Sequence, residues 1–247
     1  LNIQVNTLGG DISYLALPAY PASLESPDVP FVLLENTAQR TYLSQSGLIG
    51  KNGPDAKGRA KYSVTADQFV MAEGQDSLDV DLTLVTAEGV NIIKRFSFER
   101  GSYAVKLTYL IDNQSSANWQ GNFYAQIKRD ATGDPSKGSS MGMQAYLGAA
   151  FTETKEKYLK LDFDDIEEDG YKNSRQGGWV AFLQHYFVTA WVPDAETEHH
   201  FSARKVSGNY LSGFYDNSLT IAPGETGAVA ATFYAGPKIQ STLKELS

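Results

Sequence analysis

Apolar and polar residues alternate along much of this chain with a period of two. At the start, Leu1, Ile3 and Val5 alternate with polar residues until Gly9 and Gly10 interrupt the pattern. Successive side chains of a β-strand point to opposite faces of a sheet, so this alternation predicts strands with one buried face.

The same alternation continues through the first half of the chain. It predicts three strands over residues 76–84, 92–98 and 103–111, joined by turns at Glu88-Gly89 and Arg100-Gly101. Connections this short join antiparallel neighbours, so the three strands form a meander. Further strands are predicted at 119–128, 143–150, 156–163, 179–192, 199–206, 209–215, 217–221 and 227–235. Many strands at regular turn spacing predict an all-β fold, either a large antiparallel sandwich or a barrel.

Only the end of the chain has a helical pattern. Pro237 suits the first position of a helix, and Ile239, Leu243 and Leu246 would share one face. Residues 51–59 and 130–140 are rich in glycine, proline and polar residues, which predicts loops. No linker divides the chain, so we expect one β domain over 1–236, followed by a helical segment over 237–247.

The most apolar stretch is GGWVAFLQHYFVTAWVP, at 177–193. Gln184, His185 and Thr189 interrupt it, and it is too short to predict a membrane span. Apolar residues occupy both alternating faces, which predicts one long central strand that is covered on both sides. Pro193 would end this strand.

Composition narrows the function classes. The 247 residues carry a net charge of −8, which disfavours binding to the phosphate backbone of nucleic acids. Cysteine is absent, which excludes disulfides, thiolate catalysis and cysteine-based metal sites. With only three histidines as well, a zinc site is not expected.

Few residues are candidates for chemistry. His185 would be a general base if an open cleft with a carboxylate surrounded it, but its place in an apolar strand favours a packed histidine. His199 and His200 are adjacent in a strand and point to opposite faces, so they cannot hold one metal together. The motif G-x-S-x-G at 138–142 lacks the strand and helix of a nucleophile elbow. The acidic run at 162–169 lacks the ligand spacing of a calcium loop, so we expect a solvated turn.

Several segments together carry a family resemblance. They are NTLGGDISYLALPAYP (6–21), SQSGLIGKNGPD (44–55), AEGQDSL (72–78), the apolar stretch at 177–193 and YAGPKIQSTL (234–243). In order and spacing they resemble the large periplasmic domain of the YidC family of bacterial inner-membrane insertases. The motif residues are Gly9, Gly10, Gly178, Trp179, Tyr186, Phe187, Trp191, Pro193, Gly236 and Pro237.

The resemblance implies a galactose-mutarotase-like β-supersandwich without catalytic residues, cofactor or metal. It implies a place on the periplasmic side of the inner membrane, with the membrane-embedded helices elsewhere in the same protein and 237–247 leading towards them. The implied partners are SecDF, the SecYEG translocon and nascent membrane-protein clients.

A carbohydrate-binding or epimerase-like protein on the same sandwich is the alternative. The many aromatic residues would suit a sugar groove, and His185 is the candidate cleft residue. An epimerase needs an acid and a base that converge on the sugar ring. No motif in this sequence supplies such a pair, so an interaction domain is preferred, and a sugar ligand stays open.

Overall fold

The computed structural model describes residues 1–134, 146–153 and 158–238. The first three residues of the strand predicted at 143–150 lie outside this range. The predicted C-terminal helix lies outside it except for its first two residues. The G-x-S-x-G motif lies wholly outside it. The one helix in the described part of the chain, α1 (Phe163–Glu168), is too short to cross a membrane.

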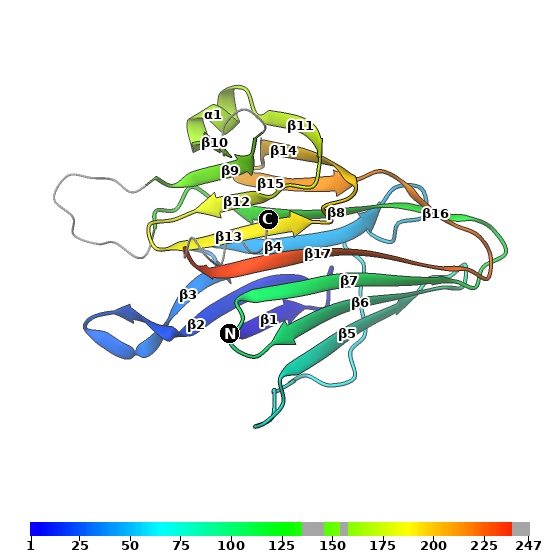
Figure 1. Cartoon of the computed structure of the whole chain (residues 1–247), viewed down its shortest axis with the longest axis horizontal. Coiled ribbons are helices and arrows are strands. Elements are labelled where there is room, and N and C mark those ends of the chain that lie inside the picture. Colours follow the sequence, from blue (N-terminus) through cyan, green and yellow to red (C-terminus); the bar gives the residue numbers. More distant parts are fainter. Residues whose placement is uncertain (135–145, 154–157, 239–247) are drawn as a thin grey trace.

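The described strands form two antiparallel sheets that face each other (Figure 1). In spatial order, the nine-stranded sheet holds β1 (Asn2–Asn6), β2 (Asp11–Ser23), β3 (Ser26–Asn36), β4 (Thr41–Ile49), β8 (Trp119–Arg129), β15 (Asn209–Asp216), β14 (Glu198–Val206) and β11 (Tyr171–Gln176), and β16 (Leu219–Ile221) pairs with β8. The eight-stranded sheet holds β10 (Tyr158–Leu161), β9 (Gly148–Thr152), β12 (Val180–Leu183), β13 (Phe187–Pro193), β17 (Thr226–Pro237), β7 (Ala104–Asn113), β6 (Val90–Glu99) and β5 (Ser77–Val85). The predicted all-β sandwich is therefore confirmed.

One face of each sheet builds the core. Along β8, every second residue is buried, including Trp119, Phe123 and Ile127. The same rule holds in β6, where Ile92 and Phe96 are buried. These side chains join one hydrophobic cluster between the sheets, which removes their surface from water.

The predicted meander is confirmed as β5, β6 and β7. Val80 pairs with Phe96, and Phe96 pairs with Leu107. The turn glycines Gly89 and Gly101 have φ values of 94° and 78°, a left-handed conformation that residues with side chains rarely adopt.

The prediction of one long strand over 179–192 is wrong. Residues 180–193 form the hairpin β12–β13, and the N–H of Gln184 donates to the carbonyl of Phe187 across its turn at 3.0 Å. Burial on both faces is confirmed, since residues 187–190 of β13 are all buried. The sequence pattern does not reveal this turn. Both faces of the hairpin are apolar, so no change between apolar and polar residues marks where the chain reverses.

The sequence pattern also misplaces helical structure. A helix is not expected at 163–168, yet α1 forms there, with Asp162 and Asp165 in a reciprocal capping box and Ile166 buried. Pro237, predicted as a first helical residue, instead ends strand β17. The division into 1–236 and 237–247 stays a prediction.

Candidate functional site

The predicted turn glycines Gly9 and Gly10 make room for two cations. Their φ values are 85° and 64°. A Cβ on Gly9 would lie 2.3 Å from Nε of Arg59, and one on Gly10 would lie 2.7 Å from Cδ of Lys94. The carbonyl of Gly9 accepts from Nη2 of Arg59 at 3.0 Å and from Nζ of Lys94 at 2.9 Å. This turn therefore requires glycine both for its backbone and for the space above it.

Asp11, Asp55, Arg59 and Lys94 form what we call the buried charge cluster. Arg59 forms ion pairs with Asp11 and, at 3.1 Å, with Asp55. Nζ of Lys94, on β6, donates to carbonyls contributed by the other side of the sandwich, at Gly9 and Ser46. Two carboxylates lie beside one guanidinium and one amine, and the hydrogen bonds of Lys94 tie the two sheets together.

Burial and neighbouring charges act in opposite directions on the two cationic side chains of this cluster. Burial lowers the pKa of Lys94 to about 7, although nearby Asp11 opposes that shift. Burial also disfavours the charge of Arg59, but Asp11 outweighs it together with other neighbours, so the pKa of Arg59 is raised. An amine with such a pKa would be a nucleophile if substrate reached it, but Lys94 is fully buried. The geometry supports a structural role for Lys94, which connects the two sheets.

The sequence contains one signal for this cluster, a lysine at a buried position of a strand. Lys94 lies between Ile92 and Phe96 in the buried register of an alternating strand. The loop 51–59 is confirmed as lacking strands, but Asp55 within it is 8% exposed and so is not a solvated residue.

His185 does not lie in a core strand, contrary to prediction. It is half-buried in the turn of the β12–β13 hairpin. Its backbone N–H donates to Oδ2 of Asp134 at 2.6 Å, and its ring packs edge-on against Tyr186 at 4.1 Å between centroids. It is not among the residues that line the groove of about 850 Å³ described below, so its role as the cleft residue of the sugar alternative stays a prediction.

His199 forms a histidine–carboxylate pair that the sequence does not reveal. Cross-strand register places Asp216 opposite His199, with 2.6 Å between Nδ1 and Oδ1. The ring's Nε2 lies 2.7 Å from the carbonyl of Asp194. Burial disfavours the charged ring, but these hydrogen bonds prevail and raise the pKa of His199. Both ring nitrogens are occupied and the residue is 1% exposed, so the pair cannot serve a substrate.

The acidic run at 162–169 contributes a capped helix instead of an ion site. Asp162 and Asp165 cap each other's backbone, and Glu167 pairs with Lys205 at 2.5 Å. Among the residues that the structure describes, no group of three or more potential ligands is arranged to hold a metal.

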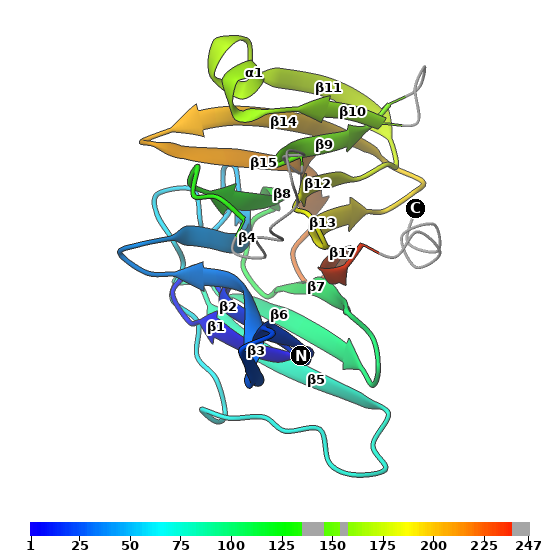
Figure 2. The ribbon, with the colours of Figure 1, turned by 90° about the vertical axis from the view of Figure 1, so that its left-hand side faces the viewer.

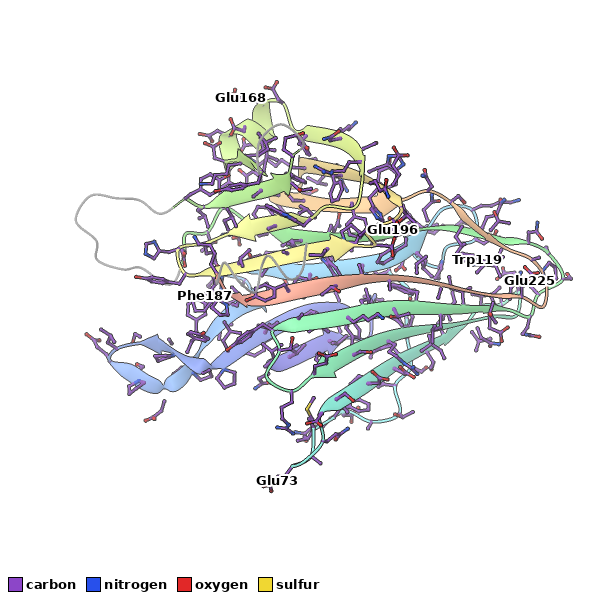
Figure 3. All side chains as sticks on the ribbon, in the orientation of Figure 1. Glu73, Trp119, Glu168, Phe187, Glu196 and Glu225 are labelled. Atoms are coloured by element: carbon purple, nitrogen blue, oxygen red, sulfur yellow. The ribbon has the colours of Figure 1, made fainter. Side chains whose placement is uncertain are left out.

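The predicted motif residues pack the sandwich at separate places and do not converge on one site. Phe187 stacks on Phe31 at 4.3 Å, at the end of the sandwich opposite Trp119 (Figure 3). A Cβ on Gly236 would lie 2.7 Å from the ring of Tyr103, and one on Gly178 would lie 2.3 Å from Cγ2 of Thr152. Trp191 packs against Phe233, and Trp179 lies near Tyr158. Pro193 and Pro237 are buried at the ends of β13 and β17, whereas Tyr186 is exposed. Their structural role stays a prediction.

A groove of about 850 Å³ is the candidate binding site, which the sequence does not predict. Its lining includes residues of β1, of β5 and of the connection from β4 to β5. β1 and β5 are edge strands of the two sheets, and Figure 2 shows them in the same part of the molecule. The floor of the groove is apolar, with Leu78, Val80, Phe96 and Phe98 from β5 and β6. An apolar floor with a few polar groups at its border suits the binding of a ligand.

Solved structures similar to this one share its fold at low sequence identity. A galactose mutarotase related enzyme from Lactobacillus acidophilus has a TM-score of 0.57 and 10% identity, covering 94% of this chain and 93% of its own. A galactose mutarotase-like protein from Lactobacillus casei has a TM-score of 0.57 and 9% identity, covering 94% and 96%. At this identity the likeness shows the mutarotase-like fold alone.

Curated relatives are much more similar in sequence. Proteins named membrane protein insertase YidC from Pseudomonas fluorescens and Pseudomonas syringae are 51% and 50% identical over 250 residues. The one from Stutzerimonas stutzeri is 49% identical over 249 residues. In each case the match covers 100% of this chain and 44% of the relative, so the chain spans less than half of these proteins. The family model described as YidC periplasmic domain matches residues 1–247, and the chain belongs to that family.

Proposed function

We propose that this chain is a non-catalytic interaction domain on the periplasmic side of a YidC-type membrane protein insertase. The observation that carries the proposal is the match of the YidC periplasmic domain to residues 1–247, together with relatives named as insertases. The proposed partners are SecDF, SecYEG and membrane-protein clients. The membrane-embedded part belongs to the remaining length of such an insertase.

The geometry of the titratable groups supports a role without catalysis. His199 has both ring nitrogens engaged, Lys94 is buried, and His185 lies outside the groove. An active site would bring an acid or base within hydrogen-bond reach of an accessible substrate position. The described residues offer an accessible groove and a buried charge cluster in different places.

Three exposed apolar side chains are accessible to a partner. Leu24 at the tip of the β2–β3 hairpin is 97% exposed, Val70 is 71% exposed and Tyr186 is 54% exposed. They lie on three separate segments, so they give three separate positions at which contact with a partner can be tested.

Site-specific crosslinking in the whole insertase tests the proposal. A photoreactive amino acid replaces Leu24, Val70 or Tyr186 in turn, in inner-membrane vesicles that contain SecDF and SecYEG. We expect a crosslink to a translocon subunit or a nascent client from at least one position. Crosslinks from none of them, combined with normal insertion by an insertase that lacks this domain, would overturn the proposal.

A further inference from the structure

The two sheets leave one side of the sandwich open beside β1 and β5. Near one end, a short crossing closes this side. Lys61 bridges to Leu8, and Ser63 exchanges two backbone hydrogen bonds of 2.8 Å with Thr83 on β5. Residues 65–76, which follow this crossing, form no strand. In the described structure β1 therefore pairs only with β2, and its other edge is unpaired along Asn2–Asn6.

The lining of the groove shows how each strand faces it. Residues 1–5 all line the groove in succession, as expected where the backbone edge of a strand is exposed to it. From β5, the lining includes only every second residue, namely Leu78, Val80 and Leu82. Alternate residues share a face, so β5 presents its side chains and β1 presents its hydrogen-bonding edge.

The apolar floor suits the side chains of an extended chain. Leu78 lies opposite Phe98, and Val80 lies opposite Phe96, in successive same-face pairs of the β5–β6 ladder. Leu78, Val80 and Phe98 are only half-buried, so their apolar surface lacks a full cover. Neighbouring pairs on one face of a sheet are separated by two residues, or about 7 Å, which is also the spacing of same-face side chains in an added strand.

The charges at the groove are unbalanced. Asp67 and Glu99 line it, are exposed, and have no ion-pair partner among the described residues. Arg100 is the cation in the lining, and its guanidinium is already bound to the carbonyls of Gln75 at 2.8 Å and Ala72 at 2.7 Å. This local excess of carboxylates adds to a chain charge of −8 and favours a cationic partner.

We propose that this groove binds an extended peptide segment that alternates apolar residues and carries lysine or arginine. The segment adds as a further strand to the free edge of β1, and its apolar side chains pack on the β5–β6 floor. Its cations lie beside Asp67 and Glu99. The inference rests on the proposed interaction role and assigns it a site and a partner chemistry. β1 has five residues, so about 17 Å of peptide is paired.

Peptide binding to the whole insertase in nanodiscs tests this. The probe is a fluorescent peptide of alternating valine and threonine with a lysine at each end. Two reference peptides carry glutamate in place of lysine, or N-methyl groups on alternate amides. We expect saturable binding of the lysine peptide, at least tenfold weaker binding of the glutamate peptide, and loss of binding on N-methylation, since a methylated amide cannot donate to β1.

Variants locate the site. Val80→Asp places a charge on the groove floor and is expected to weaken binding at least tenfold. Val85→Asp is the matched control, because Val85 lies on the same strand, is 68% exposed and does not line the groove. If Val80→Asp fails to fold, Asp67→Lys with Glu99→Lys changes only exposed residues. This pair is expected to reverse the preference towards the glutamate peptide.

Each other outcome counts against the site. Equal binding of the N-methylated peptide overturns strand addition, and an unchanged affinity in Val80→Asp or in the charge-reversed pair overturns the location. Crosslinks between two insertase copies through β1 would show that the edge is a self-association surface instead. If no peptide binds while translocon crosslinks persist, this inference fails and the proposed interaction role stands.

Discussion

Replacing Lys94 with methionine tests the electrostatics of the buried charge cluster. Methionine keeps the length of the side chain and fills a similar volume without a charge. The fully buried ammonium of Lys94 has its pKa lowered from 10.5 to about 7 by burial. Asp11, Asp55 and Arg59 surround it, and Tyr109 lies under it at 5.4 Å from ring centroid to Nζ.

The lowered pKa fixes the direction of the pH effect. Below about pH 7 the folded and unfolded states both hold the proton, and the fold bears the full cost of the buried charge. A difference of about 3.5 pKa units at about 1.4 kcal/mol per unit makes that cost about 5 kcal/mol. Between pH 7 and 10.5 the folded state loses the proton while the unfolded state keeps it, so the cost falls and stability rises with pH.

Urea unfolding at several pH values measures this effect. From about pH 6.5 to 8.5, the free energy of unfolding of the wild-type chain should rise by about 2 kcal/mol relative to Lys94→Met. Subtracting the variant cancels groups that titrate in both proteins, His199 among them. Lys106→Met, at an exposed position of β7, serves as the control and should give no such difference. A wild-type-minus-variant difference that stays flat or falls over this range would refute the argument.

Three further predictions concern the turn at Gly9, the buried His199 and sugar binding near His185. Gly9→Ala adds a clash to the strain of a positive φ and should cost about 1–3 kcal/mol more than Gly208→Ala, which has φ 79° but no atom within 4 Å of its Cβ; similar melting temperatures for both variants would contradict this. The raised pKa of His199 stabilises the fold below its unfolded value of about 6.5 and this stabilisation is lost as pH rises through the folded value. Asp216→Asn should therefore lower the free energy of unfolding more at pH 5.5 than at pH 8, and an equal loss at both pH values would argue against a charged pair. Millimolar galactose should leave the tryptophan fluorescence of the chain unchanged, because His185 lies outside the groove; a saturable change that His185→Ala abolishes would support the sugar alternative.

Sequence patterning predicts the meander well and the apolar hairpin poorly. In β5–β7 one face is more buried and the other is more exposed to solvent, so polar residues mark the register and glycines mark the turns. In β12–β13 both faces are buried, and the turn residues Gln184, His185 and Tyr186 include no glycine, proline or asparagine. Strand β11 (Tyr171–Gln176) is also not predicted, since it consists almost entirely of polar residues.

The buried charge cluster, the His199–Asp216 pair and the groove could not be predicted from the sequence. Arg59 and Asp11 are 48 positions apart, and Lys94 and Gly9 are 85 apart, so no local pattern links them. His199 meets Asp216 only through the register of β14 with β15. The groove arises because β1 and β5 are edges of two different sheets, which depends on strand order.

The sequence by itself determined the all-β class, the acidic charge, the absence of cysteine chemistry and, through its motifs, the family. Alternation, turn glycines and composition act over a few residues, so they are present in the chain before it folds. The tertiary structure alone decided which charges are buried together, which histidine is engaged and where an unpaired strand edge borders an apolar floor. These features depend on non-local pairing, since burial and desolvation are set by neighbours that only the complete sandwich brings into contact.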